Sequence, residues 1–440
     1  MIDDKNISLR HNSDSGALKS QVLTGGLLWT AFLGLAIFLI KTGVVLAQGQ
    51  APAVEAEPTG KPGAKEAPYY VVVLTGDVYS DGQQSAGASE SIRRYGAAED
   101  GGLIRQVTFS SNYLDNPVGM ARLIADLAAD PKVRIMVVNQ SVPGTAEGFR
   151  RVRAKRPDIL LLAAEPHESP GLIARWSDLV LSSDFIARGY LIPYVAKQLG
   201  AQNLVHVSFE RHLNDQYVLL RRKIMEEASK DLGLGFFDQS APDPIGRLGG
   251  SDAKNFIDRE FPNWLEQYGH QTAFFPTNDL HTEHLIRQIA FSGGLMIEGD
   301  IPSTLVGYPG AFELDFKPYL GQWALILKML ETKAVQVGAA DRLGVWPLPM
   351  GYIQTAGLVE YGIRVVEGRD GKSKLVDIID CLNMYSQGFH WNASVFSTTV
   401  NERVLRNFIL VYQDTYILGR GSINTTEVEI PLKYYAVTFD

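Results

Sequence analysis

The chain has 440 residues, of which 45% are hydrophobic and 20% are charged, and its formal net charge is −8 at pH 7. This length is enough for about two domains of ordinary size, and the composition is typical of a globular protein. A nucleic-acid binder needs a concentrated basic face, whereas the charges here are spread along the chain. Composition therefore argues against nucleic acid as a partner.

The N-terminal residues 1–47 have the pattern of an export segment. A polar stretch with scattered basic residues precedes an uncharged apolar run at 22–40. Val45-Leu46-Ala47 then has the small-residue spacing of a signal-peptidase site. The apolar run is also long enough to span a bilayer, so a cleaved signal peptide and a retained anchor both stay open. In either case we expect the body to be exported, to the periplasm or another extracytoplasmic space.

Residues 48–68 are rich in Pro, Ala, Gly and Glu and show no apolar period, which predicts a flexible linker. The folded body is expected to begin near Tyr69. Its one cysteine, Cys381, lies in an apolar run, and a single cysteine excludes an internal disulfide. We expect this thiol to be buried as a small hydrophobic side chain.

The body alternates short β-branched runs with helical patterns, which predicts an α/β fold. In the first half the expected strands are 70–75, 105–109, 133–139, 159–164 and 179–182, with helices near 84–96, 117–129 and 145–155 between them. These strands are apolar on both faces, as in a parallel sheet covered by helices on both sides. A doubly wound lobe over residues 69–190 is the prediction.

The pattern restarts after residue 190 and predicts a second α/β lobe over 191–315. Its expected strands are 204–209, 235–237, 272–276, 295–297 and 304–306, and its expected helices are 192–199, 216–232, 251–268 and 280–291. Residues 316–440 form a C-terminal extension that should cross between the lobes and pack on both. Within it we expect a helix at 319–332, a second at 352–359, a helix or strand around 407–418, and a late strand at 427–439.

An export signal followed by two tandem α/β halves resembles the type 1 periplasmic-binding fold. The segments most similar to a bacterial family of extracytoplasmic solute-binding proteins without an assigned ligand are 74–80, 275–279 and 412–421. The resemblance covers roughly residues 69–333. It implies two doubly wound parallel-sheet lobes, each with six strands, and a ligand held in the hinge-cleft between them.

Ligands of parallel α/β sheets bind beyond the carboxyl ends of the strands. The polar and aromatic residues that follow the expected strands are therefore candidate ligand-binding residues, and they suit a sugar, a nucleoside or a similar polar molecule. The alternative interpretation is that many of them are turn and cap residues. The candidates are Tyr79, Ser80, Asp81, Ser110, Asn112, Gln140, Ser141, Glu165 and His167, then Glu210, Arg211, Gln239, Asn278, Asp279 and Tyr308.

Catalytic and cofactor motifs receive little support. His281 and His284 have a spacing that can bind zinc, but no third ligand is evident nearby. Neither a dinucleotide-binding glycine pattern nor a P-loop is present. Glu165, His167 and Glu168 could act as acid and base, although in this fold such groups more often hydrogen-bond a ligand. We therefore expect no enzyme activity, no cofactor and no metal.

The expected function is capture of a small polar ligand and its delivery to the permease of an ABC-type transporter in the inner membrane. A membrane-anchored sensor that acts through a signalling partner is the alternative, and a retained segment at 22–40 would favour it. A transcription regulator of related fold would need a helix-turn-helix before the first lobe, where this chain has the apolar segment.

Overall fold

The computed structural model describes residues 67–76, 82–109, 111–113, 115–244, 249–371, 374–398 and 403–437. The predicted export segment and most of the predicted linker lie outside the described residues. So do four candidate ligand-binding residues, Tyr79, Ser80, Asp81 and Ser110. None of the helices in the described part is long and apolar enough to cross a bilayer.

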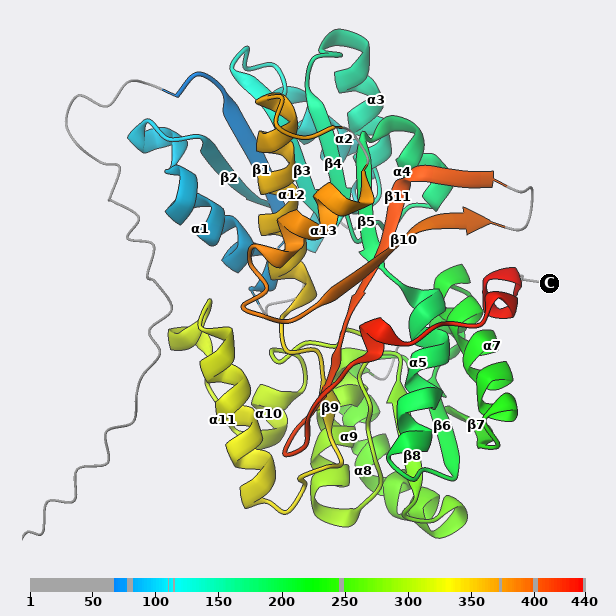
Figure 1. Cartoon of the computed structure of the whole chain (residues 1–440). Coiled ribbons are helices and arrows are strands. Elements are labelled where there is room, and N and C mark those ends of the chain that lie inside the picture. The colour runs from blue at the N-terminus through cyan, green and yellow to red at the C-terminus, as the bar shows by residue number, and fades with distance from the viewer. Residues whose placement is uncertain are drawn as a thin grey trace, which may run out of the picture. The chain divides into compact units, whose positions relative to one another are not determined.

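The first lobe is built on a seven-stranded sheet with the order β10-β11-β5-β4-β3-β1-β2 (Figure 1). All neighbouring pairs are parallel except β10 with β11. The strand order reverses between β1 and β3, which is the switch point where such sheets bind ligands. The strands are β1 (Tyr70–Gly76), β2 (Ile104–Phe109), β3 (Val133–Asn139), β4 (Leu160–Ala164), β5 (Leu179–Ser183), β10 (Trp391–Thr398) and β11 (Arg403–Gln413).

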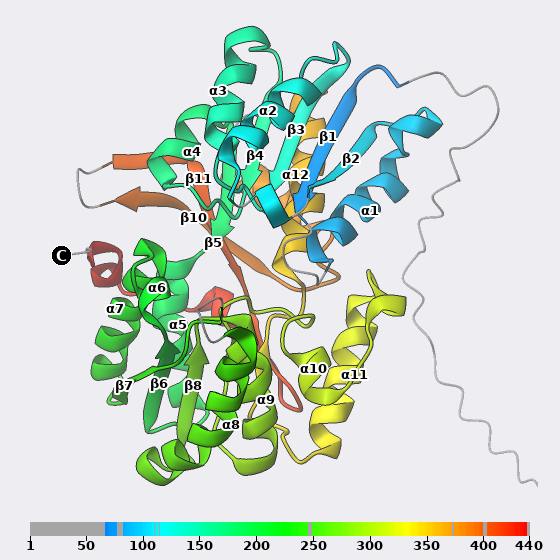
Figure 2. The ribbon, with the colours of Figure 1, turned by 180° about the vertical axis from the view of Figure 1, so that it is seen from behind.

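Helices cover both faces of this sheet, as the doubly apolar strands require. One face carries α1 (Gln83–Tyr95), α12 (Met350–Val366) and α13 (Leu375–Asn383), as Figure 1 shows. The other face carries α2 (Pro117–Leu127), α3 (Thr145–Lys155) and α4 (Pro170–Trp176), seen in Figure 2. The first fourteen residues of α12 are all buried, so this helix is a core element of the lobe.

The second lobe contains two three-stranded sheets. The parallel sheet β7-β6-β8 consists of β6 (Asn203–Ser208), β7 (Gly235–Ser240) and β8 (Thr272–Pro276). The sheet β13-β12-β9 consists of β9 (Gly344–Val345), β12 (Thr415–Ile417) and β13 (Gly421–Ile423). Leu295 bridges to Ala273 and Met296 bridges to Leu343, so this short segment joins the two sheets.

Seven helices described in this lobe surround its sheets. They are α5 (Phe185–Gln198), α6 (Glu210–Leu213), α7 (Gln216–Asp231), α8 (Gly249–Tyr268), α9 (Asp279–Ser292), α10 (Tyr308–Phe312) and α11 (Trp323–Gln336). The first of them begins seven residues before the predicted start at 192, because the Asp184 side chain accepts a hydrogen bond from the Ala187 amide and caps the helix there.

Several sequence expectations are wrong in detail. The sheet of the first lobe has seven strands instead of six, because β10 and β11 of the C-terminal extension extend it. Residues 304–306 form a turn, since Ser303 accepts the Leu305 and Val306 amides within the segment. The late strand expected at 427–439 is replaced by short 3₁₀ turns at Thr425–Glu427 and Leu432–Ala436. Tyr434 there is buried and bonds to Asp231 of α7 instead of pairing in a sheet.

Three crossovers join the lobes, at β5 to α5, at β9 to α12 and at β11 to β12 (Figure 1). They are bonded to one another. The Asp184 amide donates to the Val411 carbonyl at 2.9 Å. The Gln413 side chain bonds to both backbone groups of Leu348. The expectation of two α/β lobes with a cleft, the type 1 periplasmic-binding fold, is therefore confirmed by the arrangement of the chain.

Candidate functional site

A cavity of about 450 Å³ is lined by residues from both lobes. From the first lobe come the carboxyl ends of β3, β4 and β5 and the N-terminal residues of α1 and α12. From the second lobe come α5, α6, α7 and the loop at 300–302. The cavity thus lies where the switch point of the first sheet predicts it.

Three first-lobe candidates line the cavity: Gln140, Glu165 and His167. Gln140 and Glu165 follow the neighbouring strands β3 and β4 and have φ angles of 30° and 42°. Non-glycine residues rarely adopt this left-handed conformation, and such strain is often found at binding sites. Ser141 lies beside them but is buried, and its hydroxyl donates to the Val138 and Ala164 carbonyls. Asn112 is exposed and does not line the cavity.

Of the second-lobe candidates, Arg211 lines the cavity and the other five do not. They are Glu210, which opens α6; Gln239, which donates to the Tyr268 hydroxyl; Asn278, which caps α9; Asp279, in the first turn of α9; and Tyr308, which is buried and donates to the Gly344 carbonyl. The physical reason is that the α6–α7 segment, which follows β6, occupies this side of the cavity. In the structure these five lie at helix ends or form hydrogen bonds within the second lobe, and a ligand contact for any of them stays a prediction.

The cavity also contains residues that the strand-end rule could not find, because they lie within helices or in a distant loop. They include Arg188, Asp215, Tyr217, Arg221 and Asp300. One sequence signal was available: Arg188 is the single charged residue in the apolar run 185–196. A buried charge in such a run needs a partner and therefore marks a site worth inspection.

Each arginine that lines the cavity is paired with a carboxylate. Arg188 bonds to Glu298 at 2.5 Å, and both side chains are buried. Arg221 bonds to Asp300 at 2.5 Å. Arg211 forms two bonds to Asp243, at 2.7 and 2.9 Å. Two of these ion pairs attach residues 298–300 to α5 and α7. The positive charges of all three arginines are therefore balanced by carboxylates of the protein itself.

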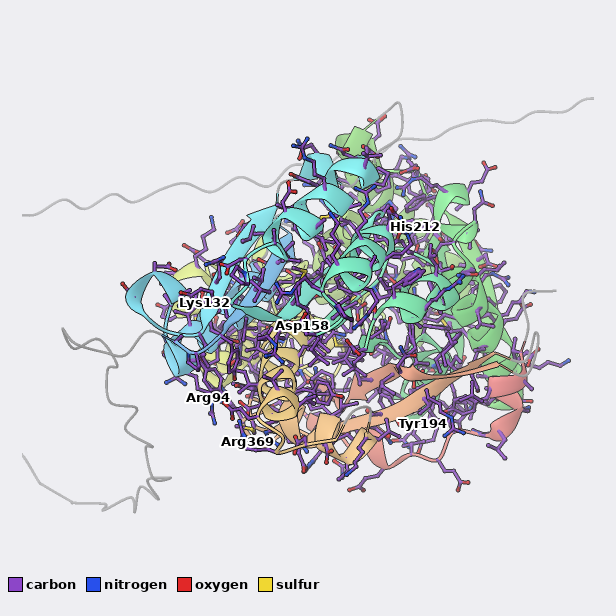
Figure 3. All side chains as sticks on the ribbon, turned by 90° about the horizontal axis from the view of Figure 1, so that it is seen from above. Arg94, Lys132, Asp158, Tyr194, His212 and Arg369 are labelled. Atoms are coloured by element: carbon purple, nitrogen blue, oxygen red, sulfur yellow. The ribbon has the colours of Figure 1, made fainter. Side chains whose placement is uncertain are left out.

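Two histidines face the cavity, and the pKa of each is lowered. For His212 the main cause is burial, and its Nδ1 lies 3.3 Å from the Thr277 hydroxyl, which in turn bonds to Ser208. Figure 3 labels His212 among the side chains of this lobe. His167 lines the cavity and its ring is exposed there. Partial removal from water by the surrounding protein still lowers its pKa, and the negative charge of Asp215 opposes this effect. Near neutral pH both rings are uncharged, and each offers one donor and one acceptor.

Glu165 is held by two neutral donors. Its Oε1 accepts the Ser183 amide at 2.8 Å and the Gln354 side-chain amide at 2.6 Å. Burial raises the pKa of this carboxyl, and the two hydrogen bonds oppose the rise. Glu168, its neighbour in the acid–base alternative, accepts the amides of Gly144 and Ala146 at the start of α3. Glu168 is thus committed to capping a helix.

Metal-binding geometry is lacking in the described part of the chain, where no group of three or more His, Cys, Asp or Glu side chains could hold an ion. His281 and His284 contact different partners, the Pro242 carbonyl and the Asp258 carboxylate. Cys381 is buried in α13, which confirms the prediction for the thiol.

The sequence matches the models of known protein families. A model of the family described as "Protein of unknown function (DUF3798)" matches residues 69–344, and a second family model matches 355–437. An uncharacterized protein of Treponema pallidum is 39% identical over 175 residues, which are 40% of this chain and 81% of the relative.

A solved structure shares the fold. A candidate transcriptional regulator from Clostridium difficile 630 has a TM-score of 0.69 at 20% identity, covering 80% of this chain and 99% of its own. A solute-binding protein of an ABC transporter from Actinobacillus succinogenes, with bound D-allose, has a TM-score of 0.44 at 13% identity, covering 69% and 93%.

Proposed function

The chain belongs to the family described as protein of unknown function (DUF3798), and we propose that it is an exported solute-binding protein that captures a small polar ligand between its lobes and delivers it to an ABC-type transporter. The observation that carries the proposal is the polar cavity of about 450 Å³, to which both lobes contribute. Binding pockets for small molecules fall in this size range.

The lining suits a sugar, a nucleoside or a similar molecule. Neutral side chains that can donate or accept hydrogen bonds are numerous in the lining: Gln83, Gln84, Gln140, His167, His212 and Tyr217. Tyr217 also packs its ring on Phe185, with centroids 4.7 Å apart, which provides an apolar surface beside the polar groups. Such a mixture binds a ligand with both hydroxyl groups and an apolar face.

Contacts from both lobes are what couple binding to closure. A ligand that touches only one lobe has no reason to favour a closed arrangement over an open one. Glu165 and Gln140 on the first lobe and Arg211, His212 and Arg221 on the second line the same cavity. A molecule that bridges them would stabilise the closed form, which a transporter can recognise.

The supporting experiment is a thermal-shift screen of the full-length chain after any bound compound has been removed by unfolding and refolding. Sugars, nucleosides and amino acids are added one class at a time. A binder should raise the unfolding temperature with increasing concentration, since it stabilises only the folded state. No shift from any class would contradict the proposal.

A membrane-anchored sensor is the second candidate, and the apolar run at 22–40 is the observation that favours it. The two functions differ in the fate of that run. Mass spectrometry of the chain from an exporting host distinguishes cleavage after Ala47, expected for a free periplasmic receptor, from retention in the membrane fraction, expected for a sensor.

A further inference from the structure

The acidic residues of the cavity differ in the partners that stabilise their negative charge. Asp300 is paired with Arg221. Asp215 caps α7, where its carboxylate accepts the amides of Tyr217 and Val218. Glu165 has only neutral donors, and no basic side chain in the described part of the chain forms an ion pair with it.

The two hydrogen bonds to Glu165 end on the same oxygen. Both the Ser183 amide and the Gln354 amide bond to Oε1, while Oε2 has no hydrogen-bond partner among the described residues. A carboxylate removed from water is stabilised chiefly by hydrogen bonds and opposite charge. A group that donates to Oε2 would therefore be bound strongly, and a negatively charged group would be repelled.

The position of this oxygen is fixed by the fold. Glu165 leaves β4 in a left-handed backbone conformation with φ at 42°. Gln354, which is fully buried on α12, donates its side-chain amide to Oε1. The amide of Gln354 cannot be turned over, because its oxygen would then face the carboxylate. Oε1 is thus occupied by the protein, and Oε2 is left for a ligand.

Second-lobe groups complete the site without adding charge. The arginines there are balanced by Glu298, Asp300 and Asp243. Arg221, only 4% exposed, nevertheless keeps one nitrogen, Nε, without a partner among the described residues. The first lobe thus has an acceptor without a donor, and each described arginine that lines the cavity already has a carboxylate partner.

We infer that Glu165 selects the ligand: Oε2 accepts a hydrogen bond from a hydroxyl or ammonium group, so that the site takes neutral or cationic polar molecules and rejects anions there. Gln354 is a positioning residue that keeps Oε2 directed to the ligand. This inference rests on the proposed function, because it concerns the same cavity.

Glu165→Gln is the substitution that tests most directly whether Oε2 accepts a hydrogen bond from the ligand. The glutamine oxygen can keep both bonds to Ser183 and Gln354, which places its NH₂ where Oε2 was. An ammonium donor would then meet a donor, and a hydroxyl would have to turn and accept, so that it loses its bond to a carboxylate. We expect at least about a tenfold loss of affinity with the fold retained, because a charge-assisted hydrogen bond is lost in both cases. Glu266→Gln, on an exposed part of α8, is the control with the same change of charge.

The experiment compares full-length wild type, Glu165→Gln, Gln354→Met and Glu266→Gln, each purified gently from an exporting host. Native mass spectrometry measures the fraction that carries a co-purified compound, and the compound's charge is read after denaturation. We expect wild type and Glu266→Gln to carry the same neutral or cationic compound, and Glu165→Gln to carry at least about tenfold less.

Acidification gives a second readout, which for the wild type does not depend on the folding of any variant. Protonation of Glu165 competes with the donor, so wild type should release the compound as pH falls, before circular dichroism shows unfolding. Gln354→Met should release it at a higher pH, because the carboxylate has lost a stabilising donor. A merely structural role of Gln354 would leave this midpoint unchanged.

The possible failures are distinct. Equal loading of wild type and Glu165→Gln, or a bound phosphate or carboxylate compound, would overturn the inference and leave the proposed function standing. A wild-type chain that carries no compound, and that no class of probe stabilises in the thermal-shift screen, would overturn the proposed function, and the inference with it.

Discussion

Gln413 and Leu348 tie two of the three crossovers together. The Gln413 side chain accepts the Leu348 amide at 3.2 Å and donates to the Leu348 carbonyl at 2.7 Å. Both residues are fully buried, so these backbone groups have no access to water. A single side chain therefore satisfies the backbone of one crossover from within another.

Gln413→Met should destabilise the protein by about 3 kcal/mol, because it leaves a buried amide and a buried carbonyl unpaired while keeping the volume. Urea unfolding measures the difference. Gln267→Met, at an exposed position on α8, is the control and should change stability by less than about 0.5 kcal/mol. Equal effects of the two substitutions would show that the Gln413 bonds do not matter.

Arg188→Met should cost about 3–5 kcal/mol, because it leaves Glu298 buried without its cation. The double variant Arg188→Met/Glu298→Gln should recover much of this loss, since the glutamine can still accept the bond from the Trp346 indole. Denaturation of the two single variants and the double variant gives the coupling energy. Additive effects would contradict a direct interaction.

Asp184 should make stability depend on pH. Burial is the main cause that raises the pKa of this crossover carboxyl to about 6. A carboxyl with a raised pKa favours the folded state below its unfolded pKa and loses that contribution as pH rises through the folded value.

Wild type should therefore lose about 2 kcal/mol relative to Asp184→Asn between pH 4 and pH 7. Asparagine can keep the cap on α5, so the comparison isolates the ionisation. Urea titrations of both proteins across this range provide the measurement. A difference that stays constant with pH would mean that Asp184 titrates normally.

Cys381 should be unreactive in the native protein. Burial raises the pKa of this thiol to about 12, and the reactive thiolate is then scarce at pH 8. A thiol reagent should label the chain only after unfolding in guanidinium. Rapid labelling of the folded protein would show that the helix α13 opens readily.

The strands of the first lobe could be predicted because Val71, Ile135 and Leu161 lie in runs that are apolar on both faces. The contribution of β10 and β11 could not, because the pairing of β11 with β5 joins residues more than 200 positions apart, and β10 enters the sheet only through β11. The prediction of a strand at 427–439 was wrong because the contacts of this segment are also with residues far away in the sequence. Its apolar residues are single buried contacts, such as Tyr434, whose ring packs against that of Tyr190 with the centroids 5.1 Å apart.

Some residues of the candidate site could likewise be predicted from the sequence, and others could not. Gln140 and Glu165 could be located because a strand end in a parallel sheet fixes the position of the next residue. Arg188 and Arg221 face the cavity from within helices, and their direction depends on how the second lobe packs. Tyr308 shows the converse error: it follows an expected strand that is a turn, and its hydroxyl is used inside the lobe.

The most direct test of the account is native mass spectrometry of the intact wild-type chain, with its mass compared before and after denaturation. The account predicts an excess mass of one small molecule per chain that disappears on denaturation, since the cavity of about 450 Å³ has room for one such ligand. Identical masses under both conditions, with no compound in the denatured extract, would contradict it.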